Sequence, residues 1–215
     1  MPAPARPPPA PNPPRRDAPA CHKALSARWN AVSGISHLPD GTPCFYVKDL
    51  YGNCFQLVQT DYIYIDEKKL TGGMAGAVVG VTDMEKSVAF YREILGYDTV
   101  QYDRTGVFAD WSFLPGGDGR FRRVLLTTST RRQGAFSGLM GADCVELVQA
   151  LDRTPRKIYE GRYWGDPGFI QICYDVTGMR ELERFCAEKG HPFTVDSCPG
   201  GITFDMGDAS GHFTY

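Results

Sequence analysis

Cysteine and histidine are the residues of this sequence that could hold a transition metal or act as nucleophiles. The chain contains seven cysteines and four histidines. No two cysteines form a CxxC pair, and the histidines form neither an HxH nor an HExxH motif, so the spacing argues against a zinc finger. Cys144 and Cys173 lie within apolar runs, where a buried free thiol is the expected role. This cysteine usage favours a reducing, cytoplasmic location.

Arginine clusters are the second candidate for chemistry, because a guanidinium binds a carboxylate through two parallel hydrogen bonds. One cluster comprises Arg120, Arg122, Arg123, Arg131 and Arg132. On a strand, alternate side chains point to opposite faces, so these residues either contact an anionic substrate or form a solvated face. Arg123 is the candidate substrate-binding residue of this cluster.

A second cluster lies in residues 153–164, which combine three arginines with two tyrosines and a tryptophan. This segment either lines a binding cavity or packs between two modules, and its candidate substrate-binding residues are Arg162 and Trp164. His212 is a further candidate, either as a base that faces the substrate or as an exposed histidine.

The composition is that of a globular protein. Hydrophobic residues make up 42% and charged residues 22% of the chain, and the net charge of -2 gives no reason to expect nucleic-acid binding. No uncharged apolar run reaches the roughly 18 residues of a membrane span. Nine of the 16 prolines fall within residues 1–20, which we expect to form a disordered or polyproline tail.

Hydrophobic patterns place the candidate residues on short strands and two helices. One helix is expected to open at Thr82, where Glu85 would complete a capping box, and to end at Gly96. A second helix is expected at 179–189. The predicted strands cover residues 44–47, 54–59, 77–81, 99–102, 107–114, 122–128, 144–150, 169–174, 193–196 and 203–206.

The chain repeats itself. Residues 81–84 and 176–179 match with an offset of 95, and residues 54–59 match 144–149 at four of six positions with an offset of 90. We therefore expect an α+β fold of repeated βαβββ modules. Its parts are a tail at 1–20, a partial first unit at 21–60, a linker at 61–73, a complete second unit at 74–150, a linker at 151–166, and a third unit at 167–215 that lacks its last strand. This pattern indicates a fragment of a longer protein or a chain with rebuilt ends.

The motifs resemble the vicinal oxygen chelate superfamily, the group of glyoxalase I, bleomycin-resistance proteins and extradiol dioxygenases. Residues 81–91 and 95–97 are similar to the strand-to-helix opening of that family. Residues 49–58 are similar to its closing hairpin, with Leu50 where proline is usual. The resemblance covers residues from about 42 to 215 and implies a cup-shaped half-barrel, formed by the curled mixed sheets of paired modules around a divalent metal.

The resemblance also implies ligand positions, with a His or Gln from each first strand and a Glu from each last strand. The repeat offsets put Gly76 and Gln171 at first-strand positions and Gln56 and Glu146 at last-strand positions. Because glycine has no donor atom, the implied ligands to Zn, Ni, Mn or Fe are Glu146 and Gln171, with Glu146 also the implied catalytic residue. A Gly76→His change is expected to tighten metal binding. The alternatives are that Glu146 pairs with an arginine and that Gln171 is a buried amide.

Two main functions follow from the resemblance. The first is a divalent-metal-dependent lyase or dioxygenase-type enzyme acting on a small oxygenated substrate. The second is a metal-free protein of the bleomycin-resistance type that sequesters a small molecule, which the residues at positions 76 and 56 favour. A third alternative is a module that serves assembly only. Which units pair is left open, and pairing of modules between two chains would give a homodimer.

Overall fold

The structure is a computed structural model of the 215-residue chain. It describes residues 17–29, 31–62, 65, 67–134, 137–138, 143–156, 160–161, 163, 166, 172–176, 178–193 and 210–213. Its elements in chain order are α1 (Ala18–Ser26), β1 (Ser36–His37), β2 (Pro43–Lys48), β3 (Cys54–Val58), β4 (Gly76–Gly80), α2 (Met84–Glu93), β5 (Thr99–Gly106), the 3-10 helix η1 (Ala109–Trp111), β6 (Phe121–Thr127), β7 (Cys144–Ala150), β8 (Ile172–Asp175), α3 (Met179–Glu188) and β9 (Ser210–Phe213).

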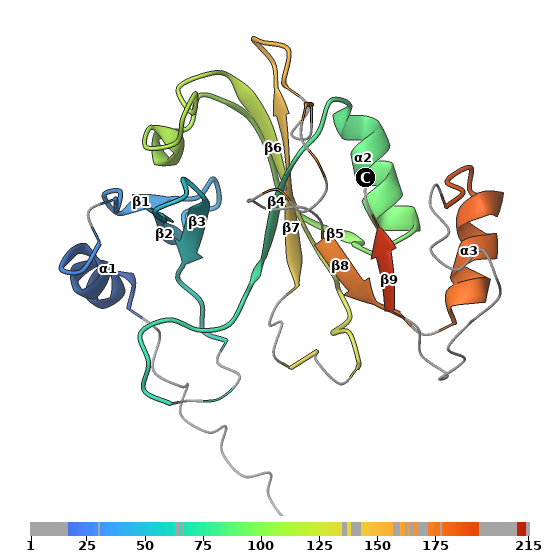
Figure 1. Cartoon of the computed structure of the whole chain (residues 1–215), viewed down its shortest axis with the longest axis horizontal. Helices are drawn as coiled ribbons and strands as arrows, with labels where there is room; N and C mark the ends of the chain where they lie inside the picture. The colour runs from blue at the N-terminus through green and yellow to red at the C-terminus, as the bar shows by residue number, and fades with distance from the viewer. Residues whose placement is uncertain are drawn as a thin grey trace, which may run out of the picture.

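The fold is α+β, as predicted. The described strands form three separate sheets, β1-β2-β3, β4-β7-β6-β5 and β8-β9, and do not close into one barrel (Figure 1). None of the helices in the described part of the chain has the length and apolar composition that a membrane crossing requires.

The second unit has the predicted βαβββ order. The edge strand β4 pairs in parallel with β7, whereas the β7-β6 and β6-β5 pairs are antiparallel. The helix α2 begins one residue later than its predicted cap. Its N-cap is Asp83, whose carboxylate accepts the backbone N–H of Lys86, so the predicted capping box at Thr82 is wrong. Gly96 has a φ of 69° and follows the helix end, as predicted.

The predicted strand at 107–114 is wrong. This segment is the β5–β6 loop and contains η1, whose residues Asp110 and Trp111 are buried. The loop turns tightly on itself, because a Cβ at Gly117 would lie only 2.0 Å from the carbonyl oxygen of Trp111. Packing of this loop against the sheet, described below, overrides the strand pattern of its sequence.

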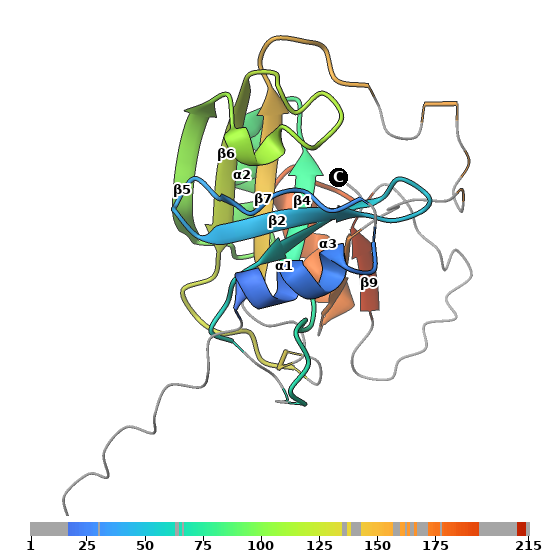
Figure 2. The same cartoon turned by 90° about the vertical axis from the view of Figure 1, so that its left-hand side faces the viewer.

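The first unit packs on the second. Its strand β2 is buried on both faces, with Cys44 and Tyr46 directed at the second unit and Phe45 and Val47 directed at α1. Figure 2 shows β2 crossing in front of β5, β6 and β7. The helix α1 begins at Ala18, so residues 18–20 of the predicted tail are helical; residues 1–16 lie outside the described residues.

The third unit packs on the other side of the second. Tyr174 of β8 and Cys186 of α3 belong to the hydrophobic core formed by α2 and the four-stranded sheet. The helix α3 lies within its predicted range, while the predicted strand at 203–206 falls outside the described residues. β9 pairs antiparallel with β8 and was not predicted.

The four-stranded sheet therefore separates two cores. We call the face covered by α2 the helix face, and the face covered by the first unit the inner face. Val124, Leu126, Val145 and Leu147 point to the helix face, whereas Phe121 and Val148 join Cys44, Tyr46 and Trp111 on the inner face. The structure thus packs the first unit on the second across the inner face.

Candidate functional site

The inner face carries a fully buried arginine. Arg123 of β6 has no exposed side-chain surface, so a solvated face is wrong for this residue. Its neighbour Arg122 points to the opposite face and forms ion pairs with Glu85 and Asp103 at the surface. The strand alternation expected from sequence is confirmed, and it divides the arginine cluster between a buried site and a solvated face.

Glu146 of β7 is the first partner of this arginine. Its Oε1 accepts hydrogen bonds from Arg123 Nε at 2.6 Å and from the hydroxyl of Tyr102 at 2.7 Å. Glu146 is 2% exposed, and Tyr102 on β5 is 3% exposed. Glu146 therefore pairs with an arginine, which was the alternative to a metal-ligand role for this residue.

The β5–β6 loop supplies the second partner. Both carboxylate oxygens of Asp110 accept from Arg123 Nη1, at 2.9 and 2.8 Å. The same loop places the rings of Phe108 and Trp111 against the guanidinium, with centroids 4.7 and 4.3 Å from its central carbon. Arg153 holds this loop in place by donating from Nη1 to the carbonyl of Gly116. Charge pairing and cation–π contacts therefore enclose the guanidinium.

A chain of hydrogen bonds continues from this cluster into the first unit. The hydroxyl of Tyr46 on β2 donates to Asp110 Oδ2 at 3.2 Å, and Gln56 Nε2 on β3 donates to the Tyr46 hydroxyl at 2.7 Å. The last-strand positions Gln56 and Glu146 are thus linked through Tyr46, Asp110 and Arg123. We call these five residues, together with Tyr102, the arginine network.

The protonation states of the network follow from its burial and charges. Burial opposes the charge of Arg123, but its bonds to Glu146 and the charge of Asp110 outweigh this and raise its pKa, so it stays cationic. Burial and the Glu146 carboxylate raise the pKa of Tyr102 well above its usual range. Burial and Asp110 do the same for Tyr46. Both hydroxyls are therefore permanent hydrogen-bond donors near neutral pH.

One donor of the network lacks an acceptor within the described part of the chain. Arg123 Nη2 is buried and finds no hydrogen-bond acceptor among the described residues. A buried N–H without an acceptor costs about 1–3 kcal/mol. Because the Arg123 side chain has no exposed surface and packs against the rings of Phe108 and Trp111, no solvent-sized space adjoins this nitrogen.

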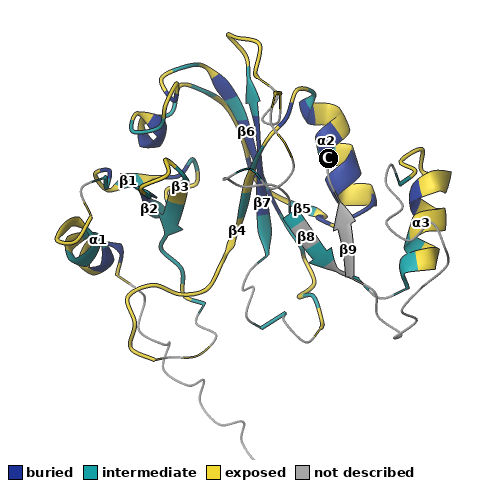
Figure 3. Cartoon of the chain, viewed as in Figure 1, coloured by how far each residue is buried: buried dark blue, intermediate teal, exposed yellow. Residues whose placement is uncertain are grey.

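An exposed strip of β4 adjoins the network. The register places Val78 beside Glu146 and Gly80 beside Val148, on the inner face. Val78 is 50% exposed. No atom of the described neighbouring residues lies within 4 Å of the position that a Cβ on Gly80 would take. Figure 3 shows the exposed residues of β4 next to the buried residues of β7. We call Val78 and Gly80 the open strip.

The described residues do not fit the metal site that the resemblance implies. Within the described ranges, no three His, Cys, Asp or Glu side chains come close enough together to hold an ion. Gly76 could not take a ligand side chain without a backbone shift, because its Cβ would lie 2.1 Å from the Cys144 carbonyl oxygen. The expected effect of Gly76→His must therefore be withdrawn. Glu146 Oε1 already accepts two hydrogen bonds, and Gln56 directs its amide nitrogen to Tyr46.

The other predicted site residues remain unplaced. Gln171, Arg162 and Trp164 lie outside the described residues. His212 falls on β9, of which only the backbone is described. The structure thus brings together Arg123 and Glu146 from the candidate set.

Three residues of the network had not been singled out from sequence. Tyr46 and Tyr102 read as ordinary strand residues, and Asp110 lies in the segment that was predicted to be a strand. An acidic residue between apolar neighbours, Phe108, Ala109 and Trp111, was the one signal that could have pointed to Asp110.

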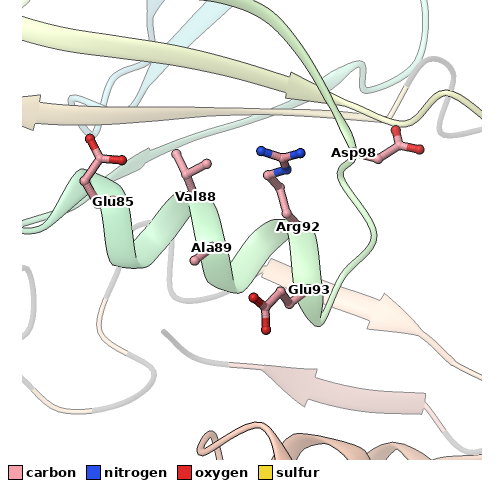
Figure 4. Close-up of a pocket in the computed structure, with 6 residues that line it drawn as sticks. All are labelled: Glu85, Val88, Ala89, Arg92, Glu93 and Asp98. Carbon is pink, nitrogen blue, oxygen red and sulfur yellow. The ribbon is translucent and has the colours of Figure 1, made fainter.

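A pocket of about 520 Å³ lies elsewhere, on the exposed side of α2 (Figure 4). Its three acidic lining residues have partners: Glu85 pairs with Arg122, Glu93 pairs with Lys189, and Asp98 accepts from Ser129. It lies on the helix side of the sheet, away from Arg123, and no predicted site residue lines it. We therefore assign the candidate site to the inner face.

Comparisons with known proteins found no match: the chain matches no protein-family model, no curated protein and no solved structure.

Proposed function

We propose that the open strip of the inner face, Val78 and Gly80 beside Glu146 and Val148, binds a small organic molecule without a metal ion, in the manner of the bleomycin-resistance-type members of the vicinal oxygen chelate superfamily. The observation that carries this proposal is the state of Arg123. Its guanidinium is bound to Glu146, at an implied ligand position, and the half-exposed Val78 lies beside Glu146 on the same face of the sheet.

The surroundings of Arg123 support a binding role. Small-molecule sites combine apolar lining with a few convergent polar groups. Here Val78 is an apolar neighbour of Glu146 in the sheet, Phe108 and Trp111 lie against the guanidinium, and the polar groups are Arg123 and Glu146. The cysteines described at positions 21, 44, 54, 144 and 186 are all free thiols, which supports the further proposal of a reducing, cytoplasmic location.

The βαβββ order of the second unit supports the family assignment within this proposal. A parallel β4-β7 pair and two antiparallel pairs give the strand order 4-7-6-5, and the inner face of that sheet meets the first unit. This contact between two units supports a site at their junction, the location that the resemblance implies.

The test is a ligand-observed NMR screen of small aromatic compounds against the wild-type chain and two variants. Val78→Arg would fill the open strip, whereas Val100→Arg places the same side chain on β5, where Val100 is 44% exposed. We expect the hits to bind the wild type and Val100→Arg and to lose binding to Val78→Arg. Hits that bind both variants equally would contradict the proposed location.

A further inference from the structure

We propose that the edge strand β4 docks a second copy of this chain, whose own β4 pairs with it antiparallel about a twofold axis through Val78. Such a dimer goes beyond the proposed function, because it uses the backbone edge of β4 and needs no ligand. Three features of β4 support it: its unused hydrogen-bonding groups, its lack of edge protection, and the symmetry of its sequence.

The backbone of β4 has an open edge. Among the described strands, β4 is the outermost of its sheet and pairs with β7 alone (Figure 2). The carbonyl of Ala75 and the N–H of Val81 both bond to β7. Because successive residues of a strand direct their backbone groups to opposite edges, the N–H and C=O groups of Gly76, Val78 and Gly80 face away from β7. All three residues are exposed, so a partner strand can reach these groups directly.

β4 lacks the features that protect sheet edges. Charged side chains, proline and β-bulges normally prevent an edge strand from pairing with another chain. The opposite edge strand, β5, carries the exposed Asp103 and Arg104 and a register shift between Val100 and Tyr102. The sequence of β4, Gly-Ala-Val-Val-Gly, contains no charge and no proline, and its register with β7 is unbroken. The edge at β4 is therefore the one that we expect to be covered.

The symmetry of this sequence selects a second copy as the partner strand. An antiparallel pair centred on Val78 sets Val78 opposite its counterpart and Gly76 opposite Gly80 of the second copy. These residues direct both backbone groups to the open edge, so each opposed pair can exchange two hydrogen bonds. Glycine on either side lets the two backbones approach closely, and the two half-exposed valines pack on each other. Because β4 carries no charge, the symmetry sets no like charges opposite each other.

Pairing through β4 also gives a closed assembly. A twofold contact uses the same surface on both copies, so no further copy can add at that edge. The joined sheet would end on β5 of each copy, where the charged side chains and the register shift oppose further pairing. The expected product is therefore a dimer, in which the open strip of one copy continues into that of the other.

The experiment is sedimentation velocity of the full chain over a range of concentrations, for the wild type, Val78→Pro and Val78→Thr. Proline removes the N–H that faces the second copy but breaks no bond to β7, because that N–H faces away from β7. Threonine keeps the N–H and the branched shape and is the matched control. We expect the wild type and Val78→Thr to dimerise with similar Kd, and Val78→Pro to raise the Kd by about tenfold or more. A wild type that stays monomeric at every concentration, or a Val78→Pro variant that dimerises as tightly, overturns the proposal.

Amide hydrogen exchange of the wild type tests the same contact if Val78→Pro does not fold. The amides of Val78 and Gly80 are bonded in the dimer, so their exchange should slow by about tenfold or more as the concentration rises through the Kd. Slow exchange at every concentration would mean that a segment of the same chain covers this edge, and fast exchange within a dimer would mean that the dimer uses another surface. Either result overturns the proposal. A monomer whose ligand binding is lost in Val78→Arg would overturn the dimer alone and leave the proposed function standing.

Discussion

The side chains of Gln56 and Glu146 are the two ends of one chain of hydrogen bonds. They occupy equivalent positions in two repeated strands, β3 of the first unit and β7 of the second, and are linked through Tyr46, Asp110 and Arg123. These two positions of the repeat are thus linked through a buried guanidinium. The network also fixes the first unit on the inner face of the second.

Removing the arginine should destabilise the fold strongly. Arg123→Gln leaves the buried carboxylates of Asp110 and Glu146 without their cation, and breaking a buried ion pair in this way costs about 3–5 kcal/mol. Arg122→Gln breaks surface pairs, for which we expect about 1 kcal/mol or less. Urea unfolding at pH 7 measures both. Equal losses in the two variants would contradict the account of Arg123.

The contact between units should appear as energetic coupling. Tyr46 donates to Asp110 across the interface, so Tyr46→Phe and Asp110→Asn should be non-additive by about 0.5–3 kcal/mol in a double-mutant cycle. Tyr97→Phe serves as the control, because Tyr97 donates to Asp143 on the other side of the sheet. With Asp110→Asn it should be additive within about 0.5 kcal/mol. If Tyr97→Phe couples with Asp110→Asn and Tyr46→Phe does not, the contact between Tyr46 and Asp110 is contradicted.

Two glycines of β4 should respond oppositely to alanine. A Cβ on Gly76 would lie 2.1 Å from the Cys144 carbonyl, so Gly76→Ala must move the backbone of β7 and should cost about 1–3 kcal/mol. Gly80 has open space at the same point, and Gly80→Ala should be neutral or stabilising by up to about 1 kcal/mol. Thermal unfolding of the two variants decides this. A destabilising Gly80→Ala would mean that the open strip is filled.

The thiol of Cys44 should report on the packing of the first unit. It lies in the inner-face core, and burial raises its pKa to about 12. The reactive thiolate is then a minute fraction at pH 8, so alkylation by iodoacetamide should be slow and should accelerate as the pH rises toward that value. The partly exposed Cys54 on β3 is the comparison within the same unit. Peptide mass spectrometry follows both sites, and equal rates at pH 8 would contradict burial of Cys44.

Local patterns predicted much of the fold. The repeat of residues 81–84 at 176–179 located a strand and helix in both units, because periodicity and capping are local properties of the chain. Strand alternation predicted that Arg122 and Arg123 lie on opposite faces of the sheet, but it could not predict which of the two is buried. Arg123 is the buried residue because the β5–β6 loop and the first unit cover its face of the sheet.

The site itself depends on contacts that no local pattern contains. Tyr46 and Asp110 are 64 positions apart, and Arg123 and Glu146 are 23 apart. Asp110 reaches Arg123 only because its segment folds as a loop with a 3-10 turn rather than as the predicted strand. The repeat marked Gln56 and Glu146 as matching positions of the sequence. It could not reveal that an arginine lies between them.

The most direct test of the central claim is the amount of metal bound per chain, measured by elemental analysis after exhaustive dialysis. The wild type is compared with Glu146→Ala, whose side chain can neither pair with Arg123 nor bind an ion. If the arginine network takes the place of a metal, zinc, nickel, manganese and iron should be far below one per chain in both proteins. Near-stoichiometric metal in the wild type that is lost in Glu146→Ala would contradict the account and make Glu146 a ligand.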